Sequence, residues 1–265
     1  MLGFPKFREA DMSEPKVITR REGAINIITI NRAAARNAVD PDTAEALEAA
    51  FLAGEADDAV AVHILTGADG HFCAGADLKA VAAETGFRRQ APMGPSWLEL
   101  KKPSIAAVEG HAVAGGLELC VLCDMRVVGR SAIFGVYCRR WGVPLIDGGT
   151  VRLPRLIGQS RAMDMILTGR PVTAEEALSF GLANRLVDDG TALAEAVNIA
   201  AQMAQFPQAC TRNDRLSVLK QWGLPMAAAL EYETEIGAAS LRAGATDGAA
   251  RFAGGKGRSG DFGDI

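Results

Sequence analysis

The chain has 265 residues, a length that allows one large α/β domain or two smaller ones. Hydrophobic residues make up 49% of it and charged residues 23%, so it can bury a sizeable core. The net charge of −4 creates no field that would attract nucleic acid or an anionic membrane surface. We therefore expect neither of these as a partner, and a polyanionic ligand would have to be held by local groups.

The five cysteines are an odd number, in a chain too long to need disulfide staples. Cys120 and Cys123 form a CxxC motif, but no second pair follows and the three histidines are scattered. We therefore expect no metal site and interpret the pair as small apolar helix residues. Residues 1–13 are interpreted as a flexible extension without a leader, and no window approaches a membrane span. Together these features predict a cytoplasmic protein with reduced thiols.

The first two thirds of the chain alternate between strand and helix patterns. Residues 16–32 contain two β-branched runs around a Glu-Gly pair, which predicts a hairpin, and a helical pattern follows Pro41. Short buried strands are predicted near residues 59–67 and 104–110. Further helices are predicted over 76–84, 116–123, 161–168 and 173–180. This alternation indicates an α/β fold with parallel strand pairing.

The pattern changes near residue 190, which divides the chain into a core at 14–190 and a helical region at 191–265. Three helices without intervening strands are predicted, over 191–206, 209–222 and 225–244. A helical region of this kind packs against a neighbouring subunit or forms a lid. The glycine-rich composition of residues 254–263 predicts a mobile tail.

Two glycine-bearing turns suggest a site built from the backbone. In FCAGADLK, Ala76 follows a strand, and in VAGGLELC, Gly115 and Gly116 open a helix that carries Glu118. The first N–H groups of a helix lack intrahelical partners and lie at its positive end. Brought together, two such turns would aim two donors at one oxygen, and one donor is worth roughly 3 kcal/mol in a transition state. Taken singly, each glycine could be ordinary turn chemistry and Glu118 could merely favour the helix dipole.

Three segments resemble the successive signatures of the crotonase (enoyl-CoA hydratase/isomerase) superfamily. They are FCAGADLK, IAAVEGHAVAGGLELCVLCD and FGVYCRRWGVPLIDGGTVRLPRLIG, and INRAAARNAVD is similar to the family's first segment. The resemblance covers roughly residues 15–255. It implies a spiral of ββα repeats with a helical C-terminal region, assembled as a homotrimer or a dimer of trimers. It also implies an acyl-CoA thioester as substrate, so that coenzyme A enters with the substrate and no cofactor is bound permanently.

The resemblance also assigns roles to individual residues. The N–H groups of Ala76 and Gly115 would hold the thioester oxygen and stabilise an enolate. The backbone around Ala74 would contact the adenine of coenzyme A. Lys79 and Lys256 are candidates for its phosphates, with a solvated surface role as the alternative for both.

The segment CRRWGVPLIDGG departs from the pattern of family hydratases, which place two glutamates around one water. Glu118 matches the first glutamate, and Cys138 stands where the second would be. A thiol is mostly neutral at pH 7 and forms weak hydrogen bonds, so Cys138 is interpreted as lining the substrate pocket. Asp147 is the better candidate for a second acid, because a family branch of isomerases has an acidic residue at the matching place. Its alternative role is to cap the helix that follows.

The neighbouring residues Arg139, Arg140 and Trp141 are interpreted as packing or interface residues that could reach the acyl chain or the phosphates. Pocket shape would depend on a predicted mobile loop between residues 82 and 100. The leading hypothesis is an enoyl-CoA hydratase-like enzyme acting through an enolate. The alternatives are isomerase-type proton transfer by Glu118 and Asp147, and an acyl-CoA-binding protein without catalysis. A nucleotide-binding module is disfavoured because the chain contains no GxxxxGK[ST] motif.

Overall fold

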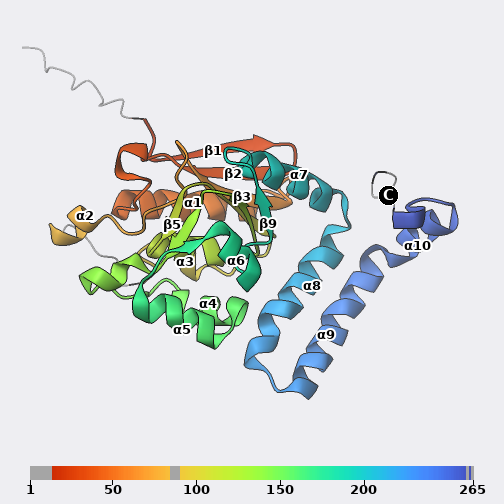
Figure 1. The fold of residues 1–265 in the computed structure, drawn as a ribbon. Coiled ribbons are helices and arrows are strands. Elements are labelled where there is room, and N and C mark those ends of the chain that lie inside the picture. The colour runs from red at the N-terminus through yellow and green to blue at the C-terminus, as the bar shows by residue number, and fades with distance from the viewer. Residues whose placement is uncertain (1–13, 84–89, 261–262, 264–265) are drawn as a thin grey trace, which may run out of the picture.

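A computed structural model describes residues 14–83, 90–260 and 263. The predicted extension at 1–13 and the stretch 84–89 of the predicted loop lie outside the described residues. Strands and helices alternate through the body of the molecule, as Figure 1 shows. The predicted α/β class is therefore confirmed.

The main sheet has six strands in the order β1-β2-β3-β4-β6-β9. Only β1 and β2 pair in an antiparallel manner, with Val17 opposite Ile30, and every other pair in this sheet is parallel. The hairpin and the parallel pairing are both as predicted. The strands are β1 (Val17–Glu22), β2 (Ile25–Ile30), β3 (Val62–Gly67), β4 (Ser104–Val108), β6 (Met125–Gly129) and β9 (Arg185–Val187).

A second, three-stranded sheet joins β5 (His111–Val113), β7 (Ile133–Gly135) and β8 (Val172–Thr173). These strands have no recognisable pattern in the sequence. Each has three residues or fewer, which is too short for an alternating pattern to be recognised. The small sheet matters for the site, because β5 leads directly into the turn at Ala114 and Gly115.

Helices cover both faces of the main sheet. On β2, Ile25 and Ile27 face a cluster containing three alanines of α7, whereas Ile28 and Ile30 face a cluster containing α1 and α3. Successive side chains of a strand point to opposite faces, so β2 separates two cores. The helices of the body are α1 (Pro41–Ala56), α2 (Leu78–Ala82), α3 (Gly115–Leu122), α4 (Gly149–Ile157), α5 (Gln159–Thr168), α6 (Ala174–Phe180) and α7 (Ala192–Gln205).

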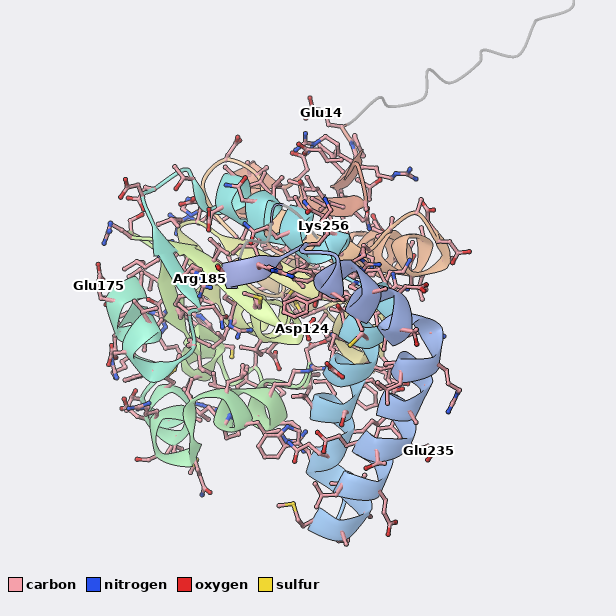
Figure 2. The ribbon with its side chains drawn as sticks, turned by 90° about the vertical axis from the view of Figure 1, so that its right-hand side faces the viewer. Glu14, Asp124, Glu175, Arg185, Glu235 and Lys256 are labelled. Atoms are coloured by element: carbon pink, nitrogen blue, oxygen red, sulfur yellow. The ribbon has the colours of Figure 1, made fainter. Side chains whose placement is uncertain are left out.

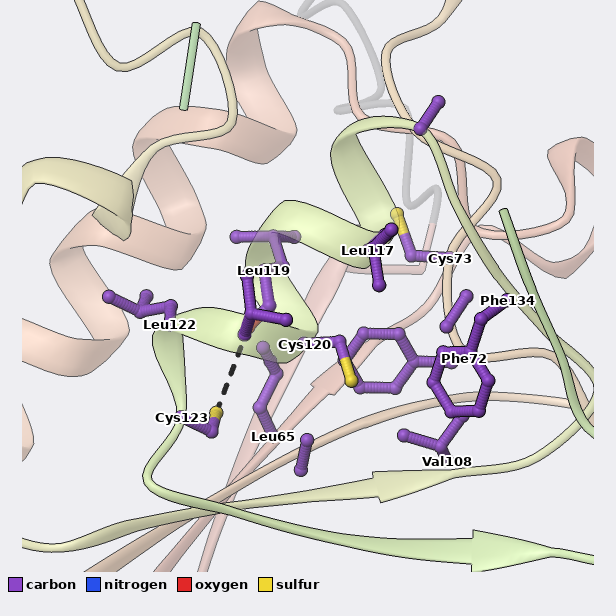
Figure 3. Close-up of a cluster of buried hydrophobic side chains, with 14 of the residues drawn as sticks. Leu65, Phe72, Cys73, Val108, Leu117, Leu119, Cys120, Leu122, Cys123 and Phe134 are labelled. Atoms are coloured by element: carbon purple, nitrogen blue, oxygen red, sulfur yellow. Dashed lines mark hydrogen bonds between the residues drawn. The ribbon is translucent and has the colours of Figure 1, made fainter. Parts of the chain in front are cut away.

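Helix α3 lies inside the larger core. All eight of its residues are buried, which explains why its sequence is apolar on every side except at Glu118. Figure 3 shows Cys120 and Cys123 among leucine and phenylalanine side chains, with the Cys123 thiol directed at the carbonyl of Leu119, 3.8 Å away. The interpretation of the CxxC motif as apolar helix residues is confirmed for Cys120, whereas Cys123 is buried beside it as the C-cap that ends α3. Burial raises the pKa of both thiols, that of Cys120 to about 12.

The C-terminal region forms a helical hairpin beside the body. Figures 1 and 2 show α8 (Gln208–Lys220) and α9 (Met226–Ser240) side by side, followed by α10 (Thr246–Ala253). The three predicted helices are confirmed as α7, α8 and α9. None of the residues of α8 and α9 is buried. Within the described part of the chain, no helix combines the length and the apolar character needed to cross a membrane.

Candidate active site

A pocket opens between α3, the turn before α2 and the segment that leads into α4. It brings together seven of the nine residues that the sequence analysis singled out. These are Ala74, Ala76, Gly115, Glu118, Cys138, Trp141 and Asp147. Residues that are 73 positions apart in the chain, such as Ala74 and Asp147, therefore border one space.

The two glycine-bearing turns are in direct contact. Gly75 has a φ of +97°, and a Cβ atom there would lie 3.0 Å from the nitrogen of Gly115. A Cβ atom on Gly116 would lie 2.1 Å from the carbonyl oxygen of Cys73. Neither position has room for a side chain, so the glycines allow the two backbones to approach each other. The predicted juxtaposition of the Ala76 and Gly115 turns is therefore present in the structure.

The two N–H groups come from different kinds of backbone. Gly115 is the first residue of α3, where an N–H group has no intrahelical partner. Ala76 forms an isolated bridge to Val39, in which the N–H of Asp77 and the carbonyl of Gly75 bind Val39. The expectation that both turns are helix starts is wrong for Ala76, because α2 begins only at Leu78. Among the described residues, no hydrogen bond of the fold uses the N–H of Ala76 or Gly115.

Glu118 is only 2% exposed, and its carboxylate is held by backbone from another segment. Its Oε1 accepts hydrogen bonds from the N–H groups of Asp147 and Gly149, both at 2.9 Å. Burial raises its pKa from 4.5 to about 7, and the charge of Asp147 adds to the rise, while the hydrogen bond from Gly149 opposes it. A carboxyl group with this pKa can both accept and return a proton near neutral pH.

Asp147 does not cap α4, so that alternative is wrong. The N-cap is Gly148, with a φ of +96° and no side-chain cap. The Oδ1 of Asp147 instead accepts hydrogen bonds from the N–H of Met93, at 3.0 Å, and from the hydroxyl of Ser96. The carboxylate is 2% exposed, lies on the cavity wall and is close enough to Glu118 to influence its charge.

Cys138 also borders the cavity, on the short helix Tyr137–Trp141. Burial raises the pKa of its thiol, and the charge of Glu118 adds to this rise, so the thiol stays protonated at neutral pH. Arg139 donates a hydrogen bond to the carbonyl of Ile166, and the Arg140 guanidinium lies 4.6 Å from the centre of the Tyr137 ring. Their interpretation as packing residues is consistent with these contacts.

The other three predicted site residues, Trp141, Lys79 and Lys256, lie at the rim of the cavity or away from it. Trp141 is 66% exposed and forms part of the cavity rim. Lys79 is exposed on α2, and Lys256 follows α10, which lies at the opposite end of the molecule in Figure 1. A single chain therefore does not bring these two lysines together, and neither borders the cavity.

Sequence reasoning missed Met93, Ser96 and Arg152, which form the support behind the acid pair. Arg152 donates to the carbonyl of Asp147 at 3.0 Å and to that of Ser96 at 2.7 Å. Met93 and Ser96 lie 54 and 51 positions before Asp147, in a segment with neither a motif nor a periodic pattern. Only the tertiary structure could have identified them.

Comparisons with known proteins agree with this geometry. The family model described as enoyl-CoA hydratase/isomerase matches residues 20–244. Enoyl-CoA hydratase EchA19 of Mycobacterium tuberculosis is 37% identical over 85% of this chain and 88% of its own length. Carnitinyl-CoA dehydratase of Salmonella arizonae is 39% identical over 73% of this chain and 76% of its own.

Among solved structures, an enoyl-CoA hydratase from M. tuberculosis H37Rv superposes with a TM-score of 0.86 at 35% identity. The match covers 91% of this chain and 96% of that one. The crotonase-like fold implied by the sequence signatures is thereby confirmed. The chain belongs to the enoyl-CoA hydratase/isomerase family.

Proposed function

We propose that this protein is an enoyl-CoA hydratase that adds water to a 2-enoyl-CoA thioester. The observation that carries the proposal is the grouping in one cavity of two N–H donors and a carboxyl group with a pKa of about 7. Those two donors, from Ala76 and Gly115, would bind the thioester oxygen. They stabilise it most when conjugate addition turns it into an enolate oxygen, because its negative charge is then greatest.

The proton balance can be completed by residues of the cavity wall. The attacking water would lie between the carboxylates of Glu118 and Asp147 and donate one hydrogen bond to each; it gives a proton only to Glu118, and its other hydrogen stays on the new hydroxyl. Glu118 takes a proton as the water oxygen bonds to the β-carbon, and the π electrons move onto the enolate. Protonated Glu118 then returns that proton to the α-carbon as the enolate collapses to the thioester, so that one water is added in total. Asp147 is the weaker base of the two, because two donors already bind its Oδ1.

Hydration is favoured over double-bond migration by the names of the similar proteins, which are a hydratase and a dehydratase. Isomerisation remains the second candidate, because Asp147 lies beside Glu118 and could exchange a proton with a different carbon. In that reaction the two carboxyl groups move a proton between the α- and γ-carbons and no water is added.

The deciding experiment incubates the purified protein with 2-enoyl- and 3-enoyl-CoA thioesters of several chain lengths in deuterated water. Product masses separate the candidates, and Glu118→Gln is the control variant. Addition of one water with deuterium at the α-carbon supports hydration. Deuterium uptake with double-bond migration alone supports isomerisation. Thioester binding without either product would refute both reactions and leave an acyl-CoA-binding role.

We further propose that the chain assembles through the α8–α9 hairpin, as a homotrimer or a dimer of trimers. The hairpin exposes large apolar side chains that a single chain leaves uncovered. They include Val218, Leu219, Trp222, Met226 and Leu230. Leu230→Glu should therefore reduce the mass measured by light scattering, whereas Leu52→Glu, at an exposed leucine of α1, should not. An unchanged mass for Leu230→Glu would refute this interface.

A further inference from the structure

The hydroxyl of Ser96 donates a hydrogen bond to a carboxylate of the cavity wall, that of Asp147. Ser96 is 1% exposed and belongs to the short helix Pro95–Trp97. An ionised carboxylate accepts hydrogen bonds but cannot donate them, so the hydroxyl is the donor to Asp147. Because Ser96 and Asp147 are both buried, water does not compete for this hydrogen bond.

The segment that carries Ser96 is fixed on both sides. Gly94 has a φ of +89°, and a Cβ atom there would lie 2.2 Å from the carbonyl oxygen of Ala44 in α1. On the other side, Arg152 binds the carbonyl of Ser96, and the indole of Trp97 donates to the carbonyl of Ile146 at 3.4 Å. A serine on so constrained a segment presents its hydroxyl at one fixed point.

The same contacts connect Ser96 to both acids. Ser96 and Met93 orient the Asp147 side chain, and the Asp147 N–H holds the Oε1 of Glu118 at 2.9 Å. Arg152 joins the backbones of Ser96 and Asp147, so a displacement of one carbonyl is transmitted to the other. Ser96 does not line this cavity, so it can affect the reaction only through the residues that it contacts.

We propose that Ser96 is a positioning residue, whose hydroxyl fixes the Asp147 carboxylate in the orientation that the reaction requires. This inference rests on the proposed function, because it assumes turnover that involves Asp147. Loss of the hydroxyl removes one of the hydrogen bonds that orient the Asp147 carboxylate and leaves that of the Met93 N–H, so the orientation of the carboxylate is less well defined. The substrate contacts made by Ala76 and Gly115 stay in place, so the effect falls on kcat and not on KM.

The test is a double-mutant cycle with Ser96→Ala and Asp147→Asn. Ser96→Ala should lower kcat about 10- to 100-fold and change KM less than about threefold. In the Asp147→Asn background the same substitution should change kcat by less than about twofold, because its target is already lost. The near-isosteric Ser96→Cys, with its weak donor, should also lower kcat and guards against a folding defect in the alanine variant.

Ser104→Ala is the matched control. Ser104 is equally buried, and its hydroxyl donates to Asp124 at 3.1 Å, outside the cavity lining. Ser104→Ala should lower the thermal stability, while its kcat stays within about twofold of that of the wild type. Two results would overturn the positioning role alone, provided that the wild type is active. One is an unchanged kcat for Ser96→Ala, and the other is a kcat loss for Ser96→Ala that is equally large in the Asp147→Asn background. A wild type without turnover would overturn the proposed function, and the inference with it.

Discussion

Substitution of Glu118 by glutamine should abolish most turnover and stabilise the protein at the same time. The two backbone N–H groups that bind Oε1 can bind the amide oxygen of glutamine equally well. What the substitution removes is a negative charge that burial and Asp147 make unfavourable, as the rise of the Glu118 pKa from 4.5 to about 7 shows. The ionised Glu118 carboxylate thus serves catalysis but lowers the stability of the folded protein.

The size of this effect follows from the pKa difference. Between pH 4.5 and pH 7 the folded protein holds the Glu118 proton more tightly than the unfolded chain does, so the free energy of unfolding falls as pH rises. One pKa step corresponds to about 1.4 kcal/mol, so ionised Glu118 costs roughly 3 kcal/mol at pH 8 and less than about 1 kcal/mol at pH 5. Glu118→Gln should therefore raise Tm by several degrees at pH 8 and only slightly at pH 5.

Thermal unfolding of both proteins at pH 5 and pH 8, followed by circular dichroism, measures this difference. Glu55→Gln is the control, because it should change the stability in the opposite direction. Although burial opposes ionisation of Glu55, hydrogen bonds from His63 and from the N–H groups of Lys101 and Lys102 lower its pKa. That variant should lose stability at pH 8, and the loss should shrink as pH falls below about 4.5. A Tm for Glu118→Gln at or below wild type at pH 8 would refute the assigned electrostatics.

The remaining predictions concern the other parts of the cavity. Gly75→Ala should lower kcat about 100-fold, because its Cβ atom would press on the Gly115 nitrogen and separate the two N–H donors. Gly70→Ala shares the left-handed backbone but meets no atom within 4 Å, so its kcat should stay near wild type. Equal losses in the two variants would argue against the two-donor site. Cys138→Ala should change kcat only a few-fold since the thiol stays protonated, whereas Cys138→Glu should increase hydration by adding a second carboxylate. A collapse of activity in Cys138→Ala would give the thiol a chemical role. In wild type, kcat/KM for hydration should fall as pH drops below about 7, where the Glu118 base becomes protonated; a flat profile from pH 5 to pH 8 would exclude Glu118 as the base.

The sequence by itself determined the fold class and most of the cavity. Glycines at 75 and 116 permit a backbone approach that side chains would prevent, and this requirement is visible in the motifs themselves. Glu118 could be placed in the first turn of its helix because the helix start and the apolar run are local signals. Short strands such as β5 and β7 could not be predicted, since pairing and not periodicity makes them strands.

Only the tertiary structure decided what the acids do. From local sequence, Asp147 is an equally good helix cap, and it loses that role because Met93 and Ser96 reach its carboxylate from more than 50 positions away. The pKa of Glu118 likewise depends on the burial that β5, α3 and the α4 turn create together, and on the Asp147 charge beside it. Solvation and charge proximity are properties of assembled segments, so no single stretch of sequence encodes them.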